Sequence, residues 1–122
     1  MTRLEHRTTG SLVDLLVAER RFEREGMQLA RRRRIAGRLV HVLPPDHLAA
    51  MKVEAAGDPR RDYDWGDARR LFLSGGARES TVRALVSRDL AERTDTLDSI
   101  LRSVTRAREE ASHPRHPRSR PR

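Results

Sequence analysis

The chain has 122 residues, of which 36% are hydrophobic and 36% are charged, with a formal net charge of +8. This length suits one domain with a single core. The absence of cysteine excludes disulfides, thiolate metal sites and cysteine nucleophiles. No apolar run approaches the roughly 18 residues of a membrane span, and the first residues lack the apolar region of a secretory signal. We therefore expect a cytoplasmic protein without membrane contact.

The chain begins with two expected strands, at residues 3–7 and 12–18, joined through turn residues 8–11 as a hairpin. The second strand is an apolar run typical of a buried strand, and it is interrupted by Asp14. A carboxylate in such a strand is costly unless it is paired, hydrogen-bonded or bound to a metal. Strand alternation could equally direct Asp14 to solvent. Both interpretations stay open.

The next segment is expected to be a helix over residues 19–35, followed by a third strand at 38–43 that ends at Pro44. The helix includes the run Arg31–Arg34, which indicates either a solvated face or a phosphate-binding patch. His41 and the later His47 are expected to be packed or capping residues, because no histidine spacing suits a zinc site.

The rest of the chain shows the apolar spacing of amphipathic helices. Pro45 suits the first turn of the first of these helices, and Asp46 is well placed against its dipole. The pattern predicts four helices, over residues 45–56, 62–73, 78–91 and 95–110. The last ten residues hold four arginines and no acid, so we expect residues 112–122 to be a disordered tail after a domain over 1–111.

Two further features bear on chemistry. Asp64 and Asp67 are three residues apart and share a helix face, although acids in a first turn often serve only the helix dipole. Asp62-Tyr63-Asp64 also matches D-x-D, but it lacks the preceding strand and Gly-Ser turn of a phosphoryl-transfer site. The single lysine, Lys52, stands among 25 arginines. A codon bias towards arginine would explain the excess of arginine. Against such a bias, the single lysine either indicates that position 52 requires a compact ammonium or remains by chance.

Several segments in order resemble one family. They are Val13-Asp14-Leu15-Leu16-Val17-Ala18, Phe22-Glu23-Arg24-Glu25, Val42 to Lys52, Arg60-Arg61, and Asp64-x-x-Asp67-x-Arg69-x-Leu71. This order resembles the nucleotidyltransferase-like proteins of the AbiEii/AbiGii type, toxin components of bacterial toxin–antitoxin and abortive-infection systems. The resemblance covers residues 3–73. It implies an α+β fold in which a small mixed N-terminal sheet of about three strands precedes a helical C-terminal region.

The resemblance also implies roles for four residues. Asp14 corresponds to a catalytic carboxylate that binds Mg²⁺. Lys52 corresponds to the lysine on the nucleotide-phosphate side of the site, and Asp64 and Asp67 to the D-x-x-D that fixes this lysine. Two Mg²⁺ ions need several oxygen ligands to hold a triphosphate for in-line attack. The family's G-S…D-x-D element, which supplies two of them, has no counterpart here.

The resemblance therefore implies a truncated or degenerate nucleotidyltransferase. It would bind NTP and Mg²⁺, and transfer a nucleotide to an RNA or protein acceptor only if the missing N-terminal half is supplied; an antitoxin is the implied partner. The alternative is a non-catalytic basic module that binds nucleic acid or an antitoxin-like partner. A third reading is a helical interaction protein.

Overall fold

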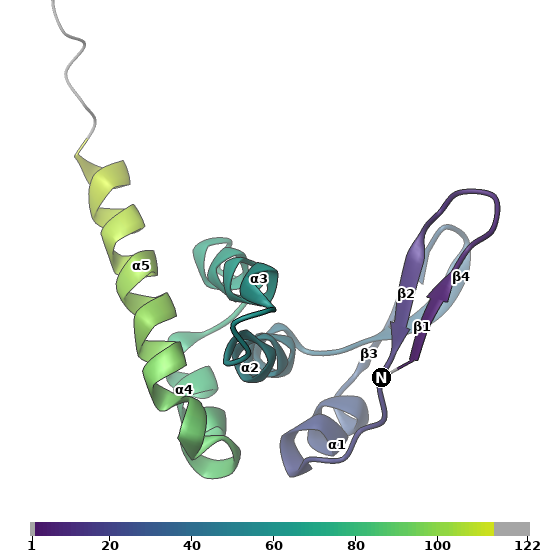
Figure 1. The fold of residues 1–122 in the computed structure, drawn as a ribbon, viewed down its shortest axis with the longest axis horizontal. Coiled ribbons are helices and arrows are strands. Elements are labelled where there is room, and N and C mark those ends of the chain that lie inside the picture. The colour runs from purple at the N-terminus through teal and green to yellow at the C-terminus, as the bar shows by residue number, and fades with distance from the viewer. Residues whose placement is uncertain (1, 114–122) are drawn as a thin grey trace, which may run out of the picture.

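The structure, a computed structural model, describes residues 2–113 apart from the side chains of Thr2 and Asp14. Within this range the fold is α+β. The five α-helices pack around one core, and two separate two-stranded antiparallel sheets stand outside it (Figure 1). None of the helices in this range is both long and apolar enough to cross a membrane. The expected tail lies outside the described residues from position 114 onward.

The C-terminal helices agree with the sequence prediction. They are α2 (Pro45–Ala56), α3 (Asp62–Leu73), α4 (Glu79–Asp89) and α5 (Thr94–Ser112), with a short 3₁₀ turn at Ala91–Arg93 before α5. Each bound lies within two residues of the expected one. Pro45 occupies the first helical position of α2, where its missing N–H costs no intrahelical hydrogen bond.

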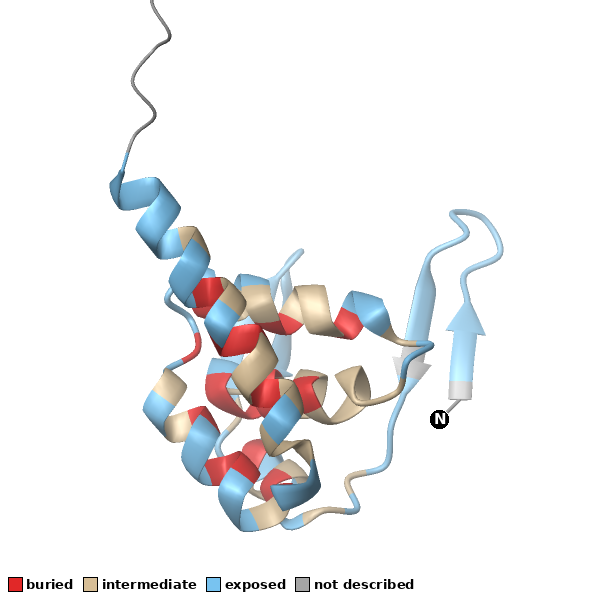
Figure 2. Ribbon diagram, turned by 60° about the vertical axis from the view of Figure 1, so that its left-hand side comes forward, coloured by how far each residue is buried: buried red, intermediate tan, exposed pale blue. Residues whose placement is uncertain are grey.

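The core lies between these helices and is mainly aliphatic, as expected (Figure 2). The helix α1 (Arg21–Gln28) contributes Phe22, which is fully buried together with Phe72 of α3. The other buried apolar side chains are Ala49, Ala50, Val53, Ala68, Ala77, Val82, Leu85, Val86, Leu90, Leu97, Ile100, Leu101 and Val104. All five helices therefore contribute to a single core.

The helix expected over residues 19–35 is wrong in its second half. α1 ends at Gln28, and the chain then forms β3 (Arg31–Ile35), which pairs with β4 (Arg38–Val42). The turn between them explains the difference. Ala36 and Gly37 both have positive φ, 49° and 77°, as the two central residues of a type I′ hairpin turn require. The arginine run is therefore on an extended strand and not on a helix.

The expected mixed sheet of about three strands is also wrong. β1 (Thr2–Glu5) pairs with β2 (Leu12–Leu15) in the expected hairpin, but β4 pairs with β3 in a sheet of its own. β2 is not a buried strand either, because Leu12 and Leu15 are 57% and 52% exposed. Both hairpins are exposed along the described side chains (Figure 2). The helices alone enclose the core.

We expect the core and the hairpin β1–β2 to differ sharply in their effect on stability. Phe72→Ala removes a fully buried ring and should lower the free energy of unfolding by about 3–5 kcal/mol. Leu12→Ala, on the exposed strand β2, should change it by less than about 0.5 kcal/mol. Urea unfolding followed by circular dichroism measures both. A large loss in Leu12→Ala would contradict the placement of the hairpin outside the core.

Candidate functional site

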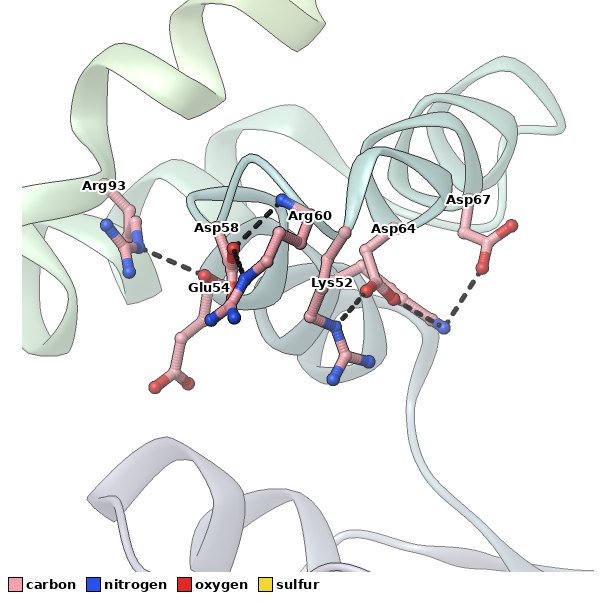
Figure 3. A network of polar contacts seen from close by, with 8 residues as sticks. Lys52, Glu54, Asp58, Arg60, Asp64, Asp67 and Arg93 are labelled. Carbon is pink, nitrogen blue, oxygen red and sulfur yellow. Dashed lines mark hydrogen bonds and ion pairs between the residues drawn. The ribbon is translucent and has the colours of Figure 1, made fainter. Parts of the chain in front are cut away.

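The ammonium group of Lys52 lies between two carboxylates (Figure 3). Its Nζ is 3.2 Å from Oδ1 of Asp64 and 3.1 Å from Oδ2 of Asp67, and it donates a hydrogen bond to each. Asp64 is almost fully buried, with 1% exposure, whereas the side chain of Lys52 is 30% exposed. The partly exposed ammonium of Lys52 therefore contacts a carboxylate, that of Asp64, which is itself buried.

The local fold explains how these side chains meet. Lys52 is near the end of α2, and the chain reverses through residues 57–61 so that α3 packs against α2. The reversal includes a hydrogen bond from the N–H of Arg61 to the carbonyl of Asp58, at 2.9 Å. Asp64 and Asp67 are three residues apart at the start of α3, so one helix face presents both to Lys52. The expected shared face is confirmed.

Two arginines complete the charge network. Nε of Arg61 donates to Oδ2 of Asp64 at 2.7 Å, and Arg70 donates to Oδ1 of Asp67. The guanidinium of Arg61 also lies over the ring of Tyr63, 5.4 Å from its centroid, in cation–π distance. Three cations surround two carboxylates in this network, which leaves a formal net charge of +1.

The contacts between Lys52 and Asp67 shift the pKa of each group in the direction that keeps it charged. Burial lowers the pKa of Lys52, but its hydrogen bonds to Asp67 and Asp64 outweigh burial and raise the pKa above its ordinary value. Burial raises the pKa of Asp67, but hydrogen bonds from Lys52 and Arg70 outweigh it and lower the pKa. The Lys52–Asp67 contact is therefore an ion pair at neutral pH.

The described acids do not fit a magnesium centre. Among the described side chains, no group of three or more His, Asp or Glu residues could hold a metal ion. The oxygens of Asp64 and Asp67 already accept hydrogen bonds from Lys52 and two arginines. The D-x-D match at Asp62–Asp64 also fails, because Asp62 is exposed while Asp64 is buried on α3. These acids act on cationic side chains rather than on a metal.

Asp14 lies on β2 opposite Arg3, outside the helical core. Its side chain is not among those described, so its predicted role in metal binding stays a prediction. The chain that follows it approaches the helices, since Leu16 and Val17 line a cavity of about 360 Å³ with Met51 and Arg61. Because Arg61 also binds Asp64, this cavity borders the Lys52 network. The structure thus brings Lys52, Asp64 and Asp67 together and places Asp14 on the hairpin β1–β2, outside the helical core.

A second polar cluster, at the start of α2, was missed by sequence reasoning. Asp46 is buried and accepts hydrogen bonds from the N–H of Arg78 at 2.7 Å and from its guanidinium at 2.9 and 3.1 Å. His47 is buried as expected for a packed residue, and its Nε2 is 3.6 Å from Oε1 of Glu25. No local signal could reveal the Asp46 contact, because its partner is 32 residues away.

No family model, no curated protein and no solved structure matches this chain.

The two carboxylates of the network should differ in their contribution to stability. Asp64→Asn removes the anion that neutralises Lys52 and Arg61 in a buried position, so it should lower the free energy of unfolding by about 2–4 kcal/mol. Asp67→Asn, at a side chain 32% exposed, should cost only about 0.5–1 kcal/mol. Both changes preserve side-chain size. Equal losses in urea unfolding would contradict the burial difference.

The raised pKa of Lys52 predicts a loss of stability at alkaline pH. Above its ordinary pKa of 10.5 the unfolded chain releases this proton before the folded chain does, so the free energy of unfolding falls as pH rises through the raised pKa. Below 10.5 the contribution is fully present. Lys52→Arg keeps its charge at these pH values, so its free energy of unfolding, measured with urea, should fall less steeply across this range. The same dependence of the free energy of unfolding on pH in both proteins would contradict the raised pKa of Lys52.

Proposed function

We propose that the chain is the nucleotide-binding portion of a nucleotidyltransferase-like protein of the AbiEii/AbiGii type, with a partial fold of that family. In this proposal Lys52 contacts the phosphates of an NTP. The single observation that supports it most is the contact of Lys52 with both Asp64 and Asp67. This is the arrangement that the resemblance implies for the lysine and the D-x-x-D of the family.

The chemistry of the lysine suits this role. An ammonium group has three N–H donors, and the two carboxylates take two of them. One donor is left for a phosphate oxygen, and the 30% exposure of the side chain allows access. Asp64 and Asp67 would repel a phosphate if they were alone. Arg61 and Arg70 offset their charge.

Nucleotide transfer requires more than this network. We propose that Asp14 is a catalytic carboxylate that binds Mg²⁺, and that the remaining metal ligands are supplied by another polypeptide segment, because these 122 residues have no G-S…D-x-D element. The chain would then bind NTP by itself and transfer nucleotide to an RNA or protein acceptor only with that complement. Control by an antitoxin belongs to the same proposal.

Calorimetric titration with ATP, GTP, CTP and UTP, with and without Mg²⁺, tests the proposal. We expect at least one of them to bind the wild type, and Lys52→Gln to weaken that binding by at least tenfold. Arg83→Gln is the matched control, because it also removes one cation, but from an exposed pair with Asp98. Asp14→Asn should remove the Mg²⁺ dependence of binding and leave the metal-free affinity unchanged.

Two results would overturn the proposal. One is the absence of NTP binding by the wild type under all these conditions. The other is an equal loss in Lys52→Gln and Arg83→Gln, which would show only a general charge effect. Thermal unfolding by circular dichroism distinguishes a lost contact from a lost fold, because a folded Lys52→Gln variant should still melt cooperatively.

A further inference from the structure

The hairpin β3–β4 concentrates positive charge that the rest of the fold does not offset. It carries five arginines, Arg31–Arg34 and Arg38, and no acid occurs anywhere from Gly26 to Pro45. All of these arginines are exposed. The hairpin has a net charge of +5 in a chain whose total is +8, so it is the main basic surface of the described residues.

These arginines also differ from those of the helices in their contacts. Within residues 2–113, none of the five forms an ion pair, and the polar contact given by their side chains is from Arg34 to the carbonyl of Gly37, at 3.2 Å. Several arginines in the helices or at their N-caps bind acids instead. Examples are Arg61, Arg70, Arg78, Arg83, Arg88 and Arg108. The charge of the hairpin is therefore available to a partner.

The register separates the two faces of the hairpin. Arg31 and Arg33 share one face with Val42, and these three residues line a cavity of about 750 Å³ against the starts of α2 and α4. Arg32 and Arg34 lie on the opposite face, since successive residues of a strand alternate. His41 is directly opposite Arg32 and lies on that face too. Arg38 pairs with Ile35 and therefore shares the cavity face with Arg31 and Arg33. We define the outward face by Arg32, Arg34 and His41 and call it the basic face, because its two arginines are on the side of the hairpin away from the cavity.

We propose that the basic face of β3–β4 docks on duplex nucleic acid and binds its backbone phosphates. Arg32 and Arg34 are two residues apart, about 6.8 Å along a strand, which matches the rise of two nucleotides in a duplex strand. The hairpin has no Phe, Tyr or Trp side chain, the large rings on which unpaired bases usually stack. Backbone contact with a duplex suits these residues better than binding of a single strand.

This inference goes beyond the nucleotide site and does not depend on Lys52. The proposed contact uses phosphates only, so it is independent of base sequence and sensitive to salt. DNA and RNA duplexes share the ligand chemistry but differ in shape. A two-stranded ribbon enters the major groove of B-form DNA, whereas the major groove of A-form RNA is too narrow for it. The affinities for a DNA duplex and for an RNA duplex therefore show which of the two nucleic acids the hairpin binds.

Fluorescence anisotropy with the full chain and labelled duplexes of mixed sequence tests the inference over a range of salt concentrations. The test variant is Arg32→Gln with Arg34→Gln. The matched control is Arg83→Gln with Arg108→Gln, which removes the same charge from arginines paired with Asp98 and Glu79. We expect the test variant to bind a duplex at least tenfold more weakly at low salt. The slope of log K against log[salt] should fall by about 2, because each phosphate contact contributes about 0.9.

Several outcomes would overturn the inference. Equal weakening in the test and control variants would show that only net charge matters. Tighter binding of a single strand than of either duplex would contradict backbone docking. If the test variant still binds a duplex, but a chain that ends at His113 does not, the binding site is in the residues after His113. Preference for an acidic peptide such as polyglutamate over both duplexes would assign the face to a protein. NTP binding by the test variant should stay unchanged, which separates this result from the fate of the nucleotide site.

Discussion

The burial of Asp64 constrains the packing of the helices around it. A carboxylate with 1% exposure must be offset by cations and hydrogen bonds, because an isolated charge in this position would be prohibitive. Lys52 and Arg61 supply both, one from α2 and one from the residue that precedes α3. This requirement fixes the two helices relative to each other. The core residues Ala49, Val53 and Ala68 then meet on their common side.

The same constraint gives a physical account of the single lysine. Nζ of Lys52 binds two carboxylates on one face of α3 at nearly equal distances, 3.2 and 3.1 Å. A compact ammonium can lie between two such oxygens, whereas the planar fork of arginine favours two parallel hydrogen bonds to one carboxylate. Arg78 illustrates the other case, because its guanidinium and N–H both bind the single carboxylate of Asp46.

Features that depend on residues close together in the sequence could be predicted, whereas features that depend on distant residues could not. The four C-terminal helices follow from apolar spacing and from Pro45 and Gly75, so their bounds were accurate. The hairpin β3–β4 was missed because arginines favour helices and show no strand alternation. The two-residue turn Ala36-Gly37 was the available signal, and only its positive φ values reveal it fully.

The candidate site shows the same division. The spacing of Asp64 and Asp67 predicted a shared face, but their contact with Lys52 was implied only by the family resemblance, since nothing local links position 52 to position 64. The contact of Asp46 with Arg78 and the proximity of His47 to Glu25 join separate helices, so neither was predictable. The apolar run at 12–18 failed for a related reason. An apolar run shows that a strand has apolar side chains, but it does not show which element, if any, covers them.

The helices and the hairpin β3–β4 differ in how their charged residues are distributed. In the helical body, acids and arginines are interspersed, and ion pairs link α1 to α4, α4 to α5 and α2 to the N-cap of α4. The hairpin β3–β4 contains no acid and contributes nothing to the core. Its arginines therefore cannot be explained by stability. A strand that carries four consecutive unpaired cations repels itself at close range, and that repulsion is relieved only by counterions or an anionic partner. The hairpin is thus the segment whose positive charge is not neutralised by acids of the described fold.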